Sequence, residues 1–235
     1  VYMRHFPFVL RVISIALIII VIARPQAVNS WEETESQGID IVLALDVSGS
    51  MLAQDLQPNR IEAAKKVASE FVTDRKNDKI GLVIFAGESF TQCPLTTDHK
   101  VLLNLLKDVN FGMIEDGTAI GLGLANSVNR LKDSPSKSKV VILLTDGTNN
   151  RGQIAPLTAA DLAKSYGIRV YTIGVGTKGM APTPVQTPFG MRIQNMPVDI
   201  DEKTLTEIAS LTGGQYFRAV DTEGLREVYR EIDQM

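Results

Sequence analysis

Histidine and cysteine are scarce in this chain of 235 residues, which contains two histidines, His5 and His99, and one cysteine, Cys93. A single cysteine excludes a disulfide within the chain. His5 belongs to an apolar N-terminal end, and His99 lies at the start of an expected helix, so neither is well placed to act as a general base. Cys93 precedes a proline and fits a small buried apolar residue better than a nucleophile. These counts disfavour catalysis by histidine or cysteine.

A surplus of basic residues is also lacking. Lysine and arginine number 24 against 27 aspartates and glutamates, which gives a net charge of −3. Because no positive excess is available to neutralise phosphates, we expect no nucleic-acid partner. Hydrophobic residues make up 44% and charged residues 22% of the chain, as in ordinary globular proteins. The length suits one α/β domain of about 180–200 residues with an additional segment.

One long apolar run is present, from Phe6 to Ala23, and Arg11 is its only charged residue. A helix over this run would rise about 27 Å, close to the hydrocarbon thickness of a bilayer. We therefore expect residues 1–25 to form a transmembrane helix, followed by a polar linker over residues 26–38. A signal peptide and a buried helix are the alternatives, although no clear A-x-A cleavage site follows the run.

Beyond the linker, apolar segments of strand length alternate with amphipathic helical patterns, and this domain extends over residues 39–235. Strands that are apolar on both faces are typical of parallel sheets covered by helices on both sides. The alternation predicts an α/β fold with a doubly wound, mostly parallel sheet of about six strands. A proline in the segment 89–94 makes it an edge strand. The main strands are expected at 39–45, 80–86, 140–144 and 169–175, and the helices near 61–72, 98–106, 120–131, 155–166, 201–211 and 221–232.

The segment 176–197 interrupts this alternation. It is rich in glycine and proline and has no helical periodicity. We expect an exposed insertion, such as a loose hairpin, that could supply partner specificity, because loops of this length are often functional. A plain connection between two elements is the alternative.

Oxygen-bearing side chains follow several of the expected strands. Asp46, Ser48 and Ser50 lie in the sequence DVSGS directly after the first strand, Thr118 precedes a helix, and Asp146 follows the strand at 140–144. In an open parallel sheet, ligands bind at the carboxyl ends of the strands. Singly, each residue could be a helix cap or a turn residue. Together they predict a site for a hard cation such as Mg²⁺, which prefers oxygen ligands.

These five residues resemble the metal-ion-dependent adhesion site of von Willebrand factor A domains, which has the pattern DxSxS, then a threonine, then an aspartate. The resemblance covers roughly Ile39 to Ile232 and implies a Rossmann-like fold. It implies that Mg²⁺, or Mn²⁺, is held directly by two serines and one threonine while the two aspartates act through water. The remaining coordination position would accept an Asp or Glu carboxylate from a protein partner. The implied direct ligands are Ser48, Ser50 and Thr118, and the implied indirect ones are Asp46 and Asp146.

Four further stretches, ARPQ, FAGESFTQCPLT, DGTAIG and LLTDGTNNRG, are similar to the bacterial aerotolerance (Bat) family of membrane-anchored von Willebrand A proteins. This resemblance implies a domain held at the bacterial inner membrane, facing the periplasm, within a cell-envelope complex. Members of that family commonly carry a further membrane helix after the domain. Because the chain also begins with Val1 in place of a methionine, we expect it to be truncated at both ends.

The function expected from these patterns is metal-dependent protein binding, and we expect the chain not to be an enzyme. A structural membrane protein with a non-functional site is one alternative. A metal-dependent hydrolase or phosphotransferase is another, since Asp46 at a strand end resembles an aspartyl phosphotransferase. Those sites usually have a second aspartate two residues on, where this chain has Ser48. The first strand is also not followed by a phosphate-binding glycine motif.

Overall fold

The computed structural model describes residues 5–23, 38–187 and 190–233. The chain divides into two compact units, Val1–Ser36 and Gln37–Met235. The expected linker lies almost entirely outside the described residues.

In the first unit, helix α1 (Phe6–Ala23) forms over the predicted apolar run. Its apolar side chains are exposed, as at Phe8 and Ile13. The expected membrane span is not found, because no helix within the described residues is long and apolar enough to cross a bilayer.

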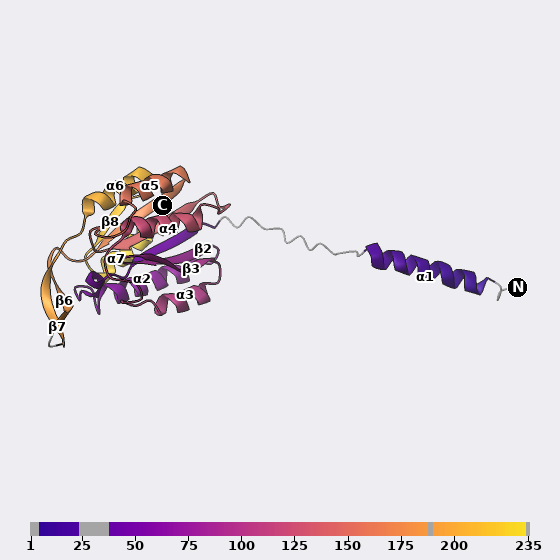
Figure 1. Ribbon diagram of the computed structural model, residues 1–235, viewed down its shortest axis with the longest axis horizontal. Coiled ribbons are helices and arrows are strands. Elements are labelled where there is room, and N and C mark those ends of the chain that lie inside the picture. The colour runs from indigo at the N-terminus through magenta and orange to yellow at the C-terminus, as the bar shows by residue number, and fades with distance from the viewer. Residues whose placement is uncertain (1–4, 24–37, 188–189, 234–235) are drawn as a thin grey trace. The chain divides into compact units, whose positions relative to one another are not determined.

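The second unit contains a sheet of six strands in the order β3-β2-β1-β4-β5-β8 (Figure 1). Neighbouring strands are parallel except for the pair β2 and β3, which is antiparallel. The predicted mostly parallel sheet and its antiparallel edge are therefore confirmed. The strands are β1 (Asp40–Asp46), β2 (Lys79–Phe85), β3 (Ser89–Thr96), β4 (Lys139–Thr145), β5 (Ile168–Val175) and β8 (Tyr216–Ala219).

Helices cover both faces of this sheet, as predicted (Figure 1). Successive side chains of a strand point to opposite faces, so Leu43 of β1 packs in one core and Val42 in the other. The first core includes α2 (Arg60–Asp74), α3 (His99–Lys107) and α7 (Thr222–Asp233). The second includes α4 (Ile120–Leu131), α5 (Pro156–Ser165) and α6 (Glu202–Thr212).

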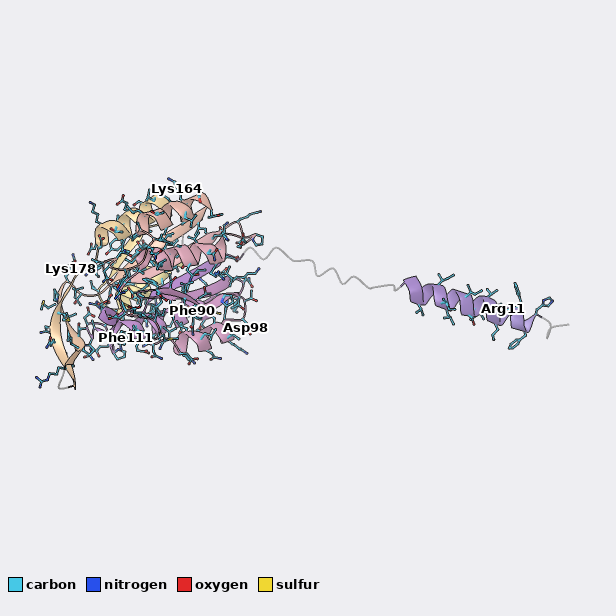
Figure 2. The ribbon with its side chains drawn as sticks, in the orientation of Figure 1. Arg11, Phe90, Asp98, Phe111, Lys164 and Lys178 are labelled. Carbon is cyan, nitrogen blue, oxygen red and sulfur yellow. The ribbon has the colours of Figure 1, made fainter. Side chains whose placement is uncertain are left out.

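Polar side chains begin several of these helices. The Asp98 carboxylate accepts hydrogen bonds from the backbone N–H groups of Lys100 and Val101 at the start of α3, and Figure 2 labels its side chain. Asn59 caps α2 by accepting from the Glu62 N–H at 2.8 Å. Such caps satisfy N–H groups that have no partner within the helix, so these boundaries are fixed locally by sequence.

The insertion forms an antiparallel hairpin of β6 (Gly179–Thr187) and β7 (Gly190–Val198). Its two strands differ in exposure, because β7 is exposed along almost all of its described residues and β6 is partly buried. Ala181 is buried against the domain, whereas Met180 and Ile193 are exposed. The Gln54 N–H donates a hydrogen bond to the Pro182 carbonyl at 2.8 Å. The prediction of an exposed insertion is therefore correct for β7, whereas β6 is attached to the domain at Ala181 and Pro182.

A chain that begins at Gly38 should fold on its own. The residues of both hydrophobic cores belong to the second unit, so removing residues 1–37 deletes none of the core residues that the structure describes. We expect the midpoint of thermal unfolding to stay within about 4 °C of that of the whole chain, a change of less than about 1 kcal/mol. Circular dichroism of both chains in the same detergent measures this. Aggregation of the shortened chain alone would show that α1 belongs to the folded domain.

Candidate functional site

The candidate site lies where β1 and β4 end. These two strands are neighbours in the sheet, with Leu45 opposite Leu144. Each apolar run stops at an aspartate, Asp46 in β1 and Asp146 directly after β4. The chain then leaves β1 through a short 3-10 helix, Gly49–Leu52. Because both strands run in the same direction, their acidic ends lie side by side.

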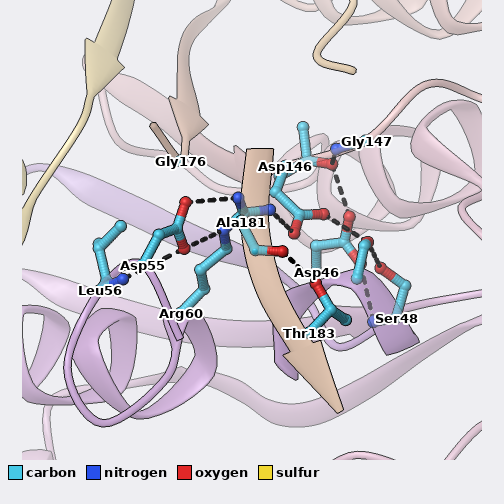
Figure 3. Close-up of polar contacts among 12 residues, drawn as sticks. Asp46, Ser48, Asp55, Leu56, Arg60, Asp146, Gly147, Gly176, Ala181 and Thr183 are labelled. Atoms are coloured by element: carbon cyan, nitrogen blue, oxygen red, sulfur yellow. Dashed lines mark hydrogen bonds and ion pairs between the residues drawn. The ribbon is translucent and has the colours of Figure 1, made fainter. Parts of the chain in front are cut away.

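Hydrogen bonds connect four of the five predicted residues. The Ser48 N–H donates to Asp46 Oδ1 at 2.9 Å, and the Ser48 and Ser50 hydroxyls lie 3.1 Å apart. The Ser50 hydroxyl donates to Asp146 Oδ1 at 2.6 Å. Figure 3 shows Asp46, Ser48 and Asp146 turned toward one another. Residues almost a hundred positions apart in sequence are thus in direct contact.

Thr118, the fifth predicted residue, is buried next to Gly147. A Cβ on Gly147 would lie 3.3 Å from the Thr118 hydroxyl oxygen, so the absence of a side chain leaves the space beside that oxygen open. The Thr118 N–H donates to Asn150 Oδ1 at 2.9 Å, and the Asn150 N–H donates to the Thr118 carbonyl at 3.0 Å. These two bonds hold the loop before α4 against the loop after β4.

Asp116 links the Thr118 loop to the loop after β1. Its Oδ1 atom accepts hydrogen bonds from the Gly49 N–H at 2.8 Å and the Gly117 N–H at 2.9 Å. A Cβ on Gly49 would lie 3.1 Å from Asp116 Oδ2, so glycine at this position allows the close approach. The sequence interpretation did not assign this role, although an acidic residue before Gly-Thr in a site loop was a usable signal.

The two site carboxylates are almost fully buried. Burial, and then the nearby charge of Asp146, raise the pKa of Asp46 to about 7, although the Thr145 hydroxyl, 2.5 Å from Asp46 Oδ2, opposes the shift. Burial also raises the pKa of Asp146, against the influence of Arg60. Two buried carboxylates in one place destabilise each other's charged forms, and a bound cation reverses that effect.

The side chain of Arg60 was not predicted to belong to the site. Its Nη1 atom donates to Asp146 Oδ2 at 2.5 Å, and its Nε and Nη2 atoms donate to the two oxygens of Asp55 at 2.8 and 2.6 Å. Burial by itself raises the pKa of Asp55, but hydrogen bonds from Arg60 and Thr177 outweigh it and bring the pKa to about 2. Arg60 opens helix α2, where the helix dipole disfavours a cation. A basic residue at the N-terminus of a helix was therefore the sequence signal from which the role of Arg60 could have been predicted.

The histidine and cysteine that were set aside as catalytic candidates have structural surroundings. His99 Nε2 lies 3.0 Å from the Asp78 carbonyl oxygen, and Cys93 is 2% exposed within the core. Cys93 is buried as expected, and His99 begins helix α3 as expected.

The oxygen atoms of the site suit a hard cation. Within the described residues, no three His, Cys, Asp or Glu side chains form a group that could hold a metal. The candidate set instead combines three hydroxyls with two carboxylates, and Mg²⁺ accepts such oxygen donors together with retained water. The contacts between Ser48, Ser50 and Asp146, and the space that Gly147 leaves beside Thr118, fit this ion.

Comparison with known proteins decides the family. The sequence profile of the von Willebrand factor type A domain matches residues 40–231. The chain belongs to this family.

Two solved structures of proteins from Bacteroides are similar to this chain. One is an aerotolerance-related membrane protein from Bacteroides fragilis, at 32% identity and a TM-score of 0.73, covering 84% of this chain and 100% of that one. The other is BatB from Bacteroides thetaiotaomicron, also at 32% identity, with a TM-score of 0.71, covering 84% of this chain and 98% of that one. The resemblance to Bat proteins seen in the sequence is thereby confirmed.

Curated relatives are longer than this chain. An uncharacterized protein of Borreliella burgdorferi is 32% identical over 188 residues, which cover 79% of this chain and 55% of that protein. A UPF0353 protein of Mycolicibacterium paratuberculosis is 29% identical over 243 residues, covering 98% of this chain and 70% of that protein. The chain thus spans little more than half the length of the first of these relatives.

Proposed function

We propose that this von Willebrand A domain is a metal-dependent protein-binding module that recognises an Asp or Glu carboxylate of a partner through Mg²⁺ or Mn²⁺. One observation carries the proposal. At the ends of β1 and β4, the hydroxyl oxygens of Ser48 and Ser50 lie close together, and the Ser50 hydroxyl donates to the Asp146 carboxylate. The hydroxyls of Ser48, Ser50 and Thr118 would hold the ion, and Asp46 and Asp146 would orient them. A bound ion supplies a positive centre with an open position for an anionic group.

A related structure supports the choice of ligand. Proximal thread matrix protein 1 from the mussel byssus has been solved with a zinc-occupied MIDAS motif, and it is 25% identical to this chain with a TM-score of 0.63, covering 83% of this chain and 44% of that one. MIDAS denotes the metal-ion-dependent adhesion site, and in that protein it holds zinc, a divalent cation. The hydroxyl-rich donor set of the present chain favours Mg²⁺ or Mn²⁺ over softer ions.

We also propose that the chain works at the bacterial inner membrane, with the von Willebrand A domain facing the periplasm, as part of a cell-envelope complex. Support comes from the similar Bacteroides fragilis protein, which is described as an aerotolerance-related membrane protein. The exposed apolar side chains of α1 would provide the contact with lipid. The proposed function is binding to a partner, and it includes no catalysed reaction.

Metal titration tests the site directly. We expect Asp46→Ala and Thr118→Ala to weaken Mg²⁺ or Mn²⁺ binding by about 10- to 100-fold, because the first removes an orienting group and the second a hydroxyl ligand. Isothermal titration calorimetry of the chain in detergent measures both. Asp40→Ala is a matched control, since Asp40 is a buried aspartate at the opposite end of β1. Equal affinities in all four proteins would contradict the proposed site.

Partner binding should require both the metal and the site. Affinity capture from native membranes uses wild type and Asp46→Ala as baits. Wild type in Mg²⁺ should recover a reproducible set of partner proteins. This set should be lost when wild type is used in EDTA and when Asp46→Ala is used in Mg²⁺. If identical proteins were recovered under all conditions, metal-dependent recognition would be wrong. The alternative of a structural protein with a non-functional site predicts that outcome.

A further inference from the structure

A chain of buried polar contacts connects the site to the base of the β6–β7 hairpin. Asp146 is bound by Arg60, and Arg60 is bound through two hydrogen bonds by Asp55 (Figure 3). Asp55 Oδ2 in turn accepts hydrogen bonds from the N–H of Thr177 at 2.8 Å and from its hydroxyl at 3.1 Å. Arg60 and the Asp55 side chain are each 3% exposed, so charge-assisted bonds here are shielded from water.

The residues that begin the hairpin are fixed tightly against Arg60. A Cβ on Gly176 would lie 2.6 Å from Arg60 Nη2, and its φ of +136° is one that glycine readily adopts. Arg218 donates to the carbonyl of Gly176 at 3.0 Å and to that of Thr177 at 2.9 Å. The hairpin cannot shift at its base without disturbing the guanidinium group that holds Asp146.

A second attachment joins the hairpin to the same segment of chain. The Gln54 N–H bonds to the Pro182 carbonyl, and the neighbouring Ala181 is 1% exposed. Gln54 immediately precedes Asp55, so one short segment contacts the hairpin through both its backbone and its side chain. The hairpin and the Asp146 carboxylate are thus positioned by common residues, and among the residues that the structure describes no hydrogen bond joins the two directly.

We propose that Arg60 and Asp55 are positioning residues that couple the metal site to the β6–β7 hairpin. The proposal rests on the metal site of the proposed function and adds regulation to it. An ion that fixes the Asp146 carboxylate also steadies Arg60, Asp55 and the base of the hairpin. By reciprocity of linked equilibria, a partner that holds the hairpin in place raises the affinity for the ion by the same factor.

Asp55→Asn gives this coupling a defined direction. The substitution keeps the shape of the side chain but removes the carboxylate that shares Arg60 with Asp146. Arg60 then neutralises Asp146 more completely, a negative charge is lost near the site, and Asp146 loses part of its support. All three effects weaken cation binding. Within the described residues Asp55 makes no hydrogen bond to the five proposed ligands, so its influence reaches the site through its bonds to Arg60 and through its charge near Asp146.

The experiment combines Mn²⁺ titration with hydrogen–deuterium exchange of the whole chain in detergent. We expect Asp55→Asn to weaken Mn²⁺ binding by about tenfold, the lower end of what outer residues of metal sites contribute. In wild type, Mn²⁺ should slow exchange in the described hairpin residues 179–187 and 190–198, and in Asp55→Asn this slowing should be lost. Glu70→Gln is the matched control, because it removes the carboxylate partner of Arg226 on an exposed surface.

A second variant covers the case in which Asp55→Asn does not fold. Thr177→Val removes the hydroxyl that donates to the Asp55 carboxylate and should weaken Mn²⁺ binding in the same direction, by about twofold to threefold, because one of several hydrogen bonds to Asp55 is lost. If wild type binds Mn²⁺ while both variants bind it equally well and keep the slowed exchange, the coupling is wrong and the metal site stands. If wild type fails to bind Mn²⁺, both proposals are overturned.

Discussion

Arg60→Met should lower the free energy of unfolding by about 3–5 kcal/mol, the range found when one partner of a buried ion pair is removed. Arg60 supplies the cation for two carboxylates, Asp55 and Asp146, through distances of 2.5–2.8 Å. Methionine is similar in length and apolar, so packing changes little. The loss in the free energy of unfolding therefore reflects the cost of two buried carboxylates that have no counter-charge.

Urea unfolding of the chain that begins at Gly38 measures this effect at neutral pH in a metal-free buffer. Arg226→Met is the control, because Arg226 pairs with Glu70 and Glu223 at the surface, where ion pairs contribute about 0–1 kcal/mol. Added Mg²⁺ should restore part of the stability of Arg60→Met, since a ligand that binds the folded state stabilises it by about 2.7 kcal/mol at a hundred times its Kd. A loss no larger than that of the control would contradict the role assigned to Arg60.

The same variant should respond to pH with a definite sign. In wild type the pKa of Asp55 lies at about 2, below the ordinary value of about 3.9 for an unfolded chain. A lowered folded pKa contributes stability that is present above about pH 4 and is lost as the pH falls toward 2. The difference in stability between wild type and Arg60→Met should therefore shrink from pH 6 to pH 3.

Much of the fold follows from local patterns in the sequence. Strands β1, β2, β4 and β5 are apolar on both faces because helices cover both sides of the sheet, and that property is visible without a structure. Strand β8 was missed since it has four residues, of which Phe217 and Ala219 are buried and Tyr216 and Arg218 only partly so. So short an alternating segment resembles many loops, and its strand identity depends on pairing with β5.

The part of the site that could be predicted is the part whose residues lie close together in the sequence or at the ends of predicted strands. Asp46, Ser48 and Ser50 form a recognisable motif in one loop, and the topology of a parallel sheet brings Asp146 beside them. Arg60 and Thr177 contribute through contacts that span 86 and 122 positions of sequence. A rule for parallel strands places strand ends, but it does not say which helical arginine turns toward them.

Among substitutions that add a single methyl group, Gly121→Ala should be one of the most destabilising in this domain. Gly121 lies in α4 where a Cβ would be 2.0 Å from the Ile154 carbonyl oxygen and 2.8 Å from its carbon. Those atoms are backbone, so relief requires α4 to move away from the chain that enters α5. We expect a loss of more than about 3 kcal/mol, beyond the usual cost of overpacking and despite the helix propensity of alanine, which favours it by about 1 kcal/mol.

The displacement should also reach the metal site, because Asn150, which holds Thr118, belongs to the same loop as Ile154. Urea unfolding and Mn²⁺ titration of Gly121→Ala should thus change together. Gly224→Ala is the matched helical control: the nearest atom to its Cβ is Asp221 Oδ1 at 3.2 Å, the end of a side chain that can turn aside. That variant should retain both stability and affinity, and similar losses in the two variants would mean that helix geometry, rather than the approach of α4 to Ile154, sets the cost.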